Sequence, residues 1–360
     1  MNKLTSKGNL KTKTQTNKIL LEKRVNQVYQ YWKKQEFPYY PKDKKYRREQ
    51  FKKFMKTNDR NSLDFSNRIF TFNHLGLSLA WSYFRHAFEV RCNNFKSPYE
   101  CFNNKTIFKN AIRKRLSGVF FEKKSVEELC NQSDSTKQLI FTMLRRVTGS
   151  QMVSNFRPVT ASMIYKIFCD DGNVVWDMSV GWGGRLLGSI KSKINYIGTD
   201  PSAKIIKGNK QLAKEFGNKK NTYELHQCGS EEFTPDYNSL DFAFTSPPYF
   251  DTEKYSNETT QSYIKFNSIL KWKTNFLKKT IQNAYYGLKP NKFCALNVAD
   301  VKNYPNFERD TVSIAESVGF KNVDRFDYQL SSQHDSFKTE PIFIFKKLWN
   351  TTYQQRLWTF

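Results

Sequence analysis

The sequence lacks the features that mark metal-binding, secreted and membrane proteins. Its six cysteines include no Cys-x-x-Cys pair, which argues against a zinc site and against a dense disulfide framework. No run of about 18 apolar residues occurs, and no apolar stretch of signal-peptide length follows the basic N-terminus. We therefore expect a soluble, cytoplasmic protein with reduced thiols, no membrane segment and no bound metal.

Acidic residues are scarce relative to basic ones. The chain holds 59 Lys and Arg against 33 Asp and Glu, a net charge of +26. Residues 1–150 contain 32 basic and 12 acidic residues and residues 151–360 contain 27 and 21, so +20 of the +26 lies in the first part. Such a field attracts polyanions and releases counterions from a phosphate backbone, which predicts a nucleic-acid partner. A solvated basic surface without a partner and a membrane-surface patch are the alternatives.

The first part of the chain has helical periodicity. A chain of 360 residues is long enough for two domains. Residues 1–16 are polar and without periodicity, so we expect a flexible basic arm there. Apolar residues recur at helical spacing over 18–35, and further helices are expected over 45–56, 75–91, 98–116 and 136–146. Residues 17–150 thus predict a basic, mostly helical domain that binds nucleic acid.

From residue 151 onward, short apolar runs alternate with helical windows. Strands are expected over 173–180, 196–200, 222–227, 240–245 and 293–298, and helices over 185–190, 202–216, 263–288 and 306–318. This alternation predicts an α/β domain over 151–360 with a doubly wound, Rossmann-like parallel sheet. Residues 323–329 and 341–348 have no helix between them, so they are expected to form an antiparallel hairpin at the edge of the sheet.

Two motifs indicate a cofactor that contains adenosine. Residues 177–184 (DMSVGWGG) follow a strand and open a helix, where glycines permit a tight turn and a close approach to a ligand. Asp200 ends the next strand, about 20 residues on, where a carboxylate can accept both ribose hydroxyls. A helix cap is the structural alternative for Asp200. NAD remains possible here, although the glycine spacing is not G-x-G-x-x-G.

A third motif, residues 245–249 (TSPPY), follows the apolar strand 240–245. An exocyclic amino nitrogen of a base is a poor nucleophile because its lone pair is delocalised into the ring. The Ser246 hydroxyl and the Pro247 carbonyl can accept its two hydrogens, and Tyr249 offers a flat face to a flipped-out base. The motif therefore points to chemistry at an exocyclic amino nitrogen of a base.

In this order and spacing, the motifs of residues 152–348 resemble those of the DNA amino-methyltransferases that make N4-methylcytosine or N6-methyladenine. The resemblance implies S-adenosylmethionine as cofactor, double-stranded DNA with a flipped base as substrate, and a role in restriction and modification. Ser rather than Asp before Pro-Pro favours cytosine N4. Enzymes that methylate a ring carbon of cytosine typically use a Pro-Cys nucleophile, and the sequence has no such dipeptide, so methyl transfer directly to nitrogen is expected. The implied catalytic residues are Thr245, Ser246, Pro247, Pro248 and Tyr249. The implied cofactor-binding residues are Phe156, Asp177, Ser179, Gly181, Gly183, Asp200, Ser230 and Glu231.

The resemblance also implies which part of the cofactor each residue contacts. Asp177, Gly181 and Gly183 would bind its methionine portion and Asp200 its ribose. Ser230 or Glu231 would lie near its adenine, and Phe156 would cover it.

Three features depart from that family's pattern. Ser179 stands where the family has Phe, and Trp182 lies between the glycines. No room for a target-recognition domain exists between Gly229 and Leu240 or after Leu348. We therefore expect the basic helical domain to contact DNA, with Lys44, Lys45, Arg47 and Arg48 as the candidate residues.

Two other functions remain open from the sequence. One is methylation of amino groups in RNA or of protein glutamine, whose enzymes carry Asn- or Asp-Pro-Pro-Tyr. The other is a non-catalytic nucleic-acid-binding protein with a methyltransferase fold.

Overall fold

The computed structural model describes residues 5–92, 94–119, 122–252, 255, 258–333 and 336–348. The first four residues of the expected basic arm lie outside this range. The chain divides into two compact units, one made of Met1–Pro41 with Arg85–Val153 and the other of Lys42–Phe84 with Ser154–Phe360. The second unit begins near the expected boundary at residue 151, but it also includes residues 42–84, which we had placed in the helical domain.

The first unit is helical. Its helices are α1 (Thr5–Lys33), η2 (Arg85–Phe88), α4 (Pro98–Asn103), α5 (Lys105–Ser117), α6 (Val126–Leu129) and α7 (Asp134–Val147). Helix α1 begins at Thr5, so most of the segment expected as a flexible basic arm is helical. The expected helix 98–116 is divided because Asn104 has an extended backbone and caps both α4 and α5. Aromatic rings form the core of this unit. The ring centroid of Phe88 lies 5.7 Å from that of Phe37 and 5.2 Å from that of Phe141.

The second unit contains one sheet, whose strand order is β1-β2-β8-β9-β7-β6-β3-β4-β5. Its strands are β1 (Leu63–Asp64), β2 (Ile69–Phe70), β3 (Val174–Asp177), β4 (Asn195–Thr199), β5 (Tyr223–His226), β6 (Leu240–Thr245), β7 (Leu288–Asn297), β8 (Phe320–Gln333) and β9 (Ser336–Lys347). Strands β3 to β7 pair in parallel, and β9 is antiparallel to both β7 and β8. The doubly wound α/β fold and the C-terminal hairpin are confirmed. The sheet continues past the hairpin, because β2 pairs with β8.

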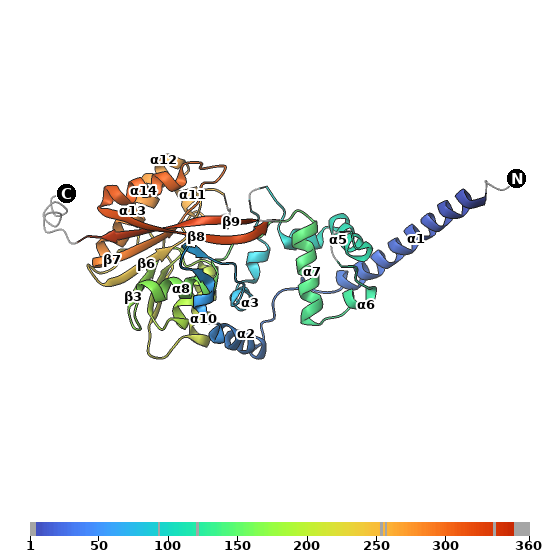
Figure 1. Ribbon diagram of the computed structural model, residues 1–360, viewed down its shortest axis with the longest axis horizontal. Helices are drawn as coiled ribbons and strands as arrows, with labels where there is room; N and C mark the ends of the chain where they lie inside the picture. The colour runs from blue at the N-terminus through green and yellow to red at the C-terminus, as the bar shows by residue number, and fades with distance from the viewer. Residues whose placement is uncertain are drawn as a thin grey trace. The chain divides into compact units, whose positions relative to one another are not determined.

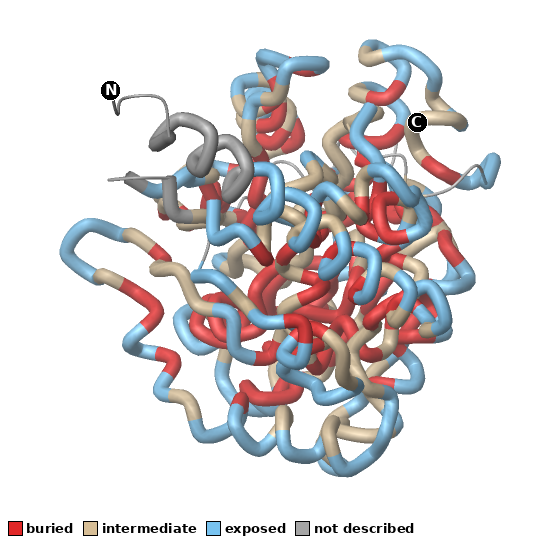
Figure 2. The backbone as a smooth tube through the Cα atoms, turned by 90° about the vertical axis from the view of Figure 1, so that its right-hand side faces the viewer, coloured by how far each residue is buried: buried red, intermediate tan, exposed pale blue. Residues whose placement is uncertain are grey.

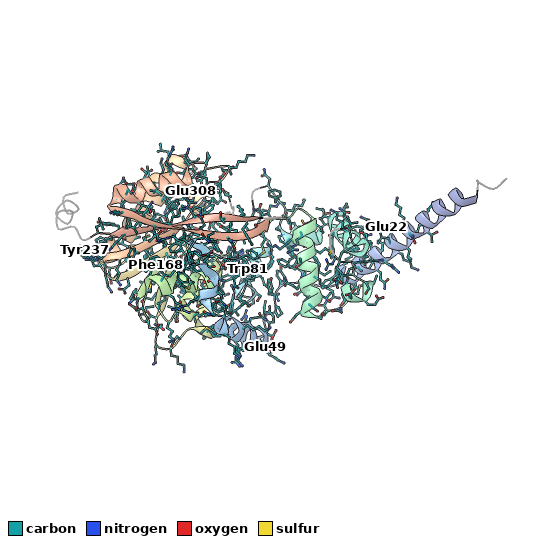
Figure 3. All side chains as sticks on the ribbon, viewed as in Figure 1. Glu22, Glu49, Trp81, Phe168, Tyr237 and Glu308 are labelled. Atoms are coloured by element: carbon teal, nitrogen blue, oxygen red, sulfur yellow. The ribbon has the colours of Figure 1, made fainter. Side chains whose placement is uncertain are left out.

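Helices cover both faces of this sheet. They are α2 (Lys44–Lys56), η1 (Asp59–Ser62), α3 (Leu77–Trp81), α8 (Pro158–Phe168), α9 (Gly184–Lys191), α10 (Ala203–Phe216), α11 (Ser262–Lys265), α12 (Ile269–Trp272), the π-helical turn η3 (Lys273–Leu277), α13 (Lys278–Gly287) and α14 (Phe307–Val318). Figure 1 shows α8 and α10 on one face and α13 and α14 on the other. Phe168 and Glu308, labelled in Figure 3, mark these two faces.

The strands are apolar on both sides because both faces are covered. Along β6, Ala243 packs in the cluster of α13 and α14, whereas Phe242 and Phe244 pack with residues of α8. Figure 2, coloured by residue burial, shows buried residues gathered toward the interior and exposed residues mostly at the periphery. The alternating side-chain direction of a strand thus divides the core into two layers.

A buried ionic network explains why residues 42–84 belong to the second unit. The buried carboxylate of Asp59 accepts hydrogen bonds from Lys191 Nζ at 2.5 Å and from Ser162 Oγ at 2.8 Å. Lys191 Nζ also donates to the carbonyl oxygens of Phe54 and Thr57, at 2.9 and 2.7 Å. The segment is therefore attached to α8 and α9, and its strands β1 and β2 extend the sheet.

Candidate active site

The three sequence motifs meet at one edge of the sheet. Strand β3 lies between β4 and β6, and the order of connection reverses there, because β4 and β5 follow on one side and β6 and β7 on the other. At such a switch point the carboxyl ends of the strands leave a crevice in which ligands bind. The glycine turn follows β3, Asp200 follows β4, and Ser246 follows β6. The sequence predicted this convergence.

Asp177, the last residue of β3, is hydrogen-bonded to side chains of β4 and β6. Its fully buried carboxylate accepts hydrogen bonds from Thr245 Oγ1 at 3.0 Å, Arg185 Nε at 2.8 Å and Tyr196 Oη at 2.5 Å. The backbone N–H of Ser179 donates to it as well, at 3.2 Å. Four protein donors occupy the two oxygens of Asp177, so the carboxylate is engaged by protein groups. Thr245 is 1% exposed and belongs to the same network.

The glycine turn requires its glycines. Gly181 and Gly183 have φ values of +54° and +78°, in the left-handed region that favours glycine. A Cβ on Gly184 would lie 1.8 Å from the carbonyl oxygen of Phe156. The backbone of Phe156 and the side chain of Asn155 therefore lie directly against the turn.

Asp200 lies directly beside the turn. Its carboxylate accepts the backbone N–H of Gly181 at 3.3 Å and that of Ser202 at 3.0 Å. Burial raises the pKa of Asp200 to about 7, although both backbone hydrogen bonds act to lower it. Ser202 precedes the first residue of α10, so the side chain of Asp200 does not cap the helix. A carboxylate has about four acceptor positions, so Asp200 retains capacity for further donors.

Phe156 differs from its predicted role. Its ring stacks on Tyr328 at 4.7 Å, meets Phe244 edge-on at 5.1 Å and is 8% exposed. The side chain is thus part of the core. The cover over the turn comes instead from the Phe156 carbonyl and from Asn155, whose Nδ2 donates to Trp182 O at 3.0 Å.

The two residues predicted to lie near the adenine, Ser230 and Glu231, differ in their hydrogen bonding. The Ser230 hydroxyl is buried and bonded to Thr280 Oγ1 at 2.8 Å. Glu231 accepts Lys265 Nζ on Oε1 at 2.8 Å, while its buried Oε2 has no hydrogen-bond partner among the described residues. An unpaired buried carboxylate oxygen is costly. Of these two residues, Glu231 is therefore the one with unused acceptor capacity.

Some residues of the TSPPY motif are partly exposed and others are buried. Ser246, Pro248 and Tyr249 are partly exposed, whereas Pro247 is buried. Tyr249 Oη donates to Glu340 Oε2 at 3.1 Å, and its ring meets Phe307 edge-on at 5.3 Å. The position of the tyrosine ring is therefore fixed by β9 and α14.

Sequence reasoning missed the groups that surround the turn. The ring centroid of Trp182 lies 6.0 Å from that of Trp81 and 5.8 Å from that of Phe84. Asn209 Nδ2 donates a hydrogen bond to Gly181 O at 2.8 Å. Figure 3 labels Trp81 at the end of the strands opposite Tyr237. An Asn on the otherwise apolar stripe of α10 was the available signal. The aromatic contacts join distant segments and have no such local signal.

The predicted DNA contacts lie on α2, and one of them needs correction. Lys44, Lys45 and Arg48 are exposed. Arg47 instead donates to Ser82 Oγ at 3.0 Å, pairs with Glu215 at 3.3 Å and lies 3.7 Å over the Tyr83 ring. Its guanidinium is occupied by protein groups because it faces α10, so it is not available to a phosphate.

Within the described part of the chain, no group of three or more His, Cys, Asp and Glu side chains is placed to hold a metal ion. No helix in that part is long and apolar enough to cross a bilayer.

No known protein family and no curated protein matches the chain by sequence. Solved structures do resemble it. A SAM-dependent methyltransferase from Methanosarcina mazei has a TM-score of 0.36 and 14% identity, covering 52% of this chain and 98% of that one. A SAM-dependent O-methyltransferase from Thermotoga maritima has a TM-score of 0.39 and 10% identity over 55% and 68%. A methyltransferase from Pyrococcus furiosus has a TM-score of 0.37 and 15% identity over 53% and 83%. The fold assignment itself depends on the strand order described above.

Proposed function

We propose that the protein is an S-adenosylmethionine-dependent methyltransferase that modifies an exocyclic amino group of a DNA base. The observation that carries the proposal is that the glycine turn, Asp200 and the TSPPY motif meet at one sheet edge. Hydrogen bonds of 3.3 Å between Gly181 N and Asp200, and of 3.0 Å between Thr245 and Asp177, connect them. A cofactor site and a base site are thereby adjacent.

The residues of this edge fit the cofactor. Asp200 retains acceptor capacity for ribose hydroxyls, Glu231 Oε2 is an unpaired acceptor for the adenine amino group, and the glycine backbone permits close approach. When bound, S-adenosylmethionine supplies an electrophilic methyl group on a positively charged sulfur. Asp177 supports the turn from behind, and Phe156 and Ser230 keep structural roles in this proposal.

The base site acts on the amino nitrogen. Ser246 Oγ and the Pro247 carbonyl would accept its two hydrogens, which localises the lone pair on nitrogen as the new N–C bond forms and the methyl–sulfur bond breaks, with the electron pair of that bond left on sulfur. Tyr249 provides an apolar face for the flipped base, at a position set by Phe307 and Glu340. The methylated nitrogen then loses one proton to water, and no base is required. Cytosine N4 is the favoured target, because Ser246 precedes the prolines.

A transfer assay tests this function. Duplex DNA is incubated with methyl-labelled S-adenosylmethionine and either the parent protein or the Pro247→Ala variant. We expect label in DNA with the parent, and a loss of about 10²–10³ in rate with the variant at nearly unchanged cofactor affinity. Label in RNA or protein alone, or equal rates for the two proteins, would contradict the proposal.

A further inference from the structure

Helix α10 presents a row of lysines to solvent. Ile205, Ile206 and Leu212 form its buried side. Its exposed side carries Lys204, Lys207, Lys210 and Lys214. The acid on this helix is Glu215, which is occupied by Arg47 and by Tyr83 Oη. The outer face of α10 is therefore uniformly positive.

Helix α2 lies beside α10 in the same unit, as Figure 1 shows. The rings of Phe51 and Phe216 stack at 4.4 Å, and Arg47 pairs with Glu215 at 3.3 Å. The side chain of Asp43 caps α2 by accepting the N–H of Tyr46 at 2.7 Å. The contacts of Phe51 and Arg47 hold α2 against α10. We define the exposed cations of these two adjoining helices as the α2–α10 surface.

The balance of charge on this surface is strongly one-sided. Helices α2 and α10 expose ten basic residues, and Glu49, labelled in Figure 3, is the one exposed acid within them. The ten are Lys44, Lys45, Arg48, Lys52, Lys53, Lys56, Lys204, Lys207, Lys210 and Lys214. None of them forms an ion pair with a described residue. Elsewhere in this unit Lys166, Lys265 and Lys273 do form such pairs.

We infer that this α2–α10 surface binds the phosphate backbone of a DNA duplex. The inference rests on the proposed function and deepens it, since it places a polymer-binding surface on the catalytic unit itself. Ten unpaired cations on two fixed helices can neutralise successive phosphates and release their counterions. The surface includes Lys44, Lys45 and Arg48 from the sequence-based prediction, replaces Arg47, and adds the α10 lysines, which that prediction did not contain.

The composition of the surface argues against a membrane. A helix that lies on a bilayer inserts apolar side chains between the headgroups. Met55, at 39% exposure, is the one large apolar side chain exposed on α2, and α10 exposes none. Cations without apolar neighbours suit the sugar-phosphate backbone, where charge neutralisation supplies most of the affinity. The surface also begins close to the site, because Lys204 is four residues after Asp200.

Binding of labelled duplex DNA, measured by fluorescence anisotropy on the full chain across salt concentrations, tests the inference. The surface variant is Lys207→Gln, Lys210→Gln and Lys214→Gln together. The matched control is Lys271→Gln, Lys278→Gln and Lys279→Gln, three exposed lysines near or on α13 on the other face of the sheet. We expect the surface variant to weaken binding and to reduce the slope of log K against log salt by about 2–3, with little change for the control. Equal effects for the two variants, or none, would overturn the inference.

Further measurements separate the partners and the proposals. If the parent binds duplex RNA or phosphatidylserine vesicles in preference to duplex DNA, the inference is wrong. Methyl transfer at saturating DNA is followed in parallel. If lysine-dependent DNA binding occurs without transfer to DNA, the surface stands and the proposed function fails. If transfer occurs but the surface variant binds DNA like the parent, the function stands and the surface fails. Unchanged thermal unfolding of the variants excludes a folding defect.

Discussion

Tyr249 Oη donates a hydrogen bond to Glu340 Oε2 at 3.1 Å, which joins the end of the TSPPY motif to strand β9. Burial raises the pKa of Glu340, while Lys338 and the Tyr249 hydroxyl act to lower it. The C-terminal hairpin therefore does more than complete the sheet. It sets the position of the ring that we propose to stack on the target base.

Removing this acceptor should impair turnover and spare cofactor binding. Glu340→Ala leaves the Tyr249 hydroxyl without its partner, so we expect the transfer rate to fall by about tenfold to a hundredfold. Glu340→Gln retains an amide oxygen as acceptor and should lose less. Single-turnover rates and calorimetric affinity for S-adenosylmethionine measure the two effects. If Glu340→Ala also slows a Tyr249→Phe background by the full factor, Glu340 does not act through the tyrosine.

Cofactor affinity should depend on the charge of Asp200. Its pKa is raised to about 7, so the carboxylate that accepts ribose hydroxyls is protonated as the pH falls below that value. We expect affinity to decrease from pH 8 to about pH 6, and Asp200→Ala to lose at least tenfold at pH 8. Titration calorimetry across this range measures both. A parent affinity that does not change with pH, or an Asp200→Ala affinity equal to that of the parent, would remove Asp200 from the cofactor site.

The same residue should reduce the stability of the ligand-free protein. The pKa of Asp200 in the folded protein, about 7, exceeds the ordinary value of 3.8. The contribution of this group to the free energy of unfolding is therefore fully present below about pH 4 and is lost as the pH rises through 7. Asp200→Asn removes this penalty. The Asp200→Asn variant should have a free energy of unfolding about 1–3 kcal/mol higher than the parent at pH 8 and nearly equal to it at pH 4. Urea unfolding at the two pH values is the measurement, and a loss of stability at pH 8 would contradict this account of Asp200.

The buried pair of Asp59 and Lys191 should be essential for attaching residues 42–84. Lys191→Met leaves the Asp59 carboxylate buried with reduced compensation, and we expect a loss of about 3–5 kcal/mol in the free energy of unfolding. Lys193→Met, which breaks an exposed ion pair with Asp171, is the matched control and should cost less than about 1 kcal/mol. Chemical unfolding measures both variants, and similar losses would contradict the assignment.

The sequence predicted the sheet and the convergence of the site because both depend on local patterns. Strand β6 was predicted at its observed bounds, and the ends of β3 and β4 place the glycine turn and Asp200 at one edge. Strand–helix alternation was sufficient to infer parallel strands and hence a common carboxyl edge.

What the sequence did not reveal depends on contacts between distant segments. The ring of Phe156 packs on Tyr328, and Arg47 pairs with Glu215, so each is occupied by a partner far along the chain. Glu340 lies 91 residues from Tyr249. The short strands β1 and β2 have no periodicity of their own and exist because β8 offers an open edge. Such pairings need three-dimensional information.

The chemical identity of the labelled nucleoside tests the central claim most directly. The parent protein and the Asp200→Ala variant are each incubated with methyl-labelled S-adenosylmethionine and a mixture of DNA, RNA and protein, and the labelled polymer is digested and separated. We predict label in DNA as N4-methylcytosine, or as N6-methyladenine if adenine is the target, with the parent, and a strong reduction with the variant. Label on a ring carbon, label confined to RNA or protein, or no transfer to any of the three would contradict the account.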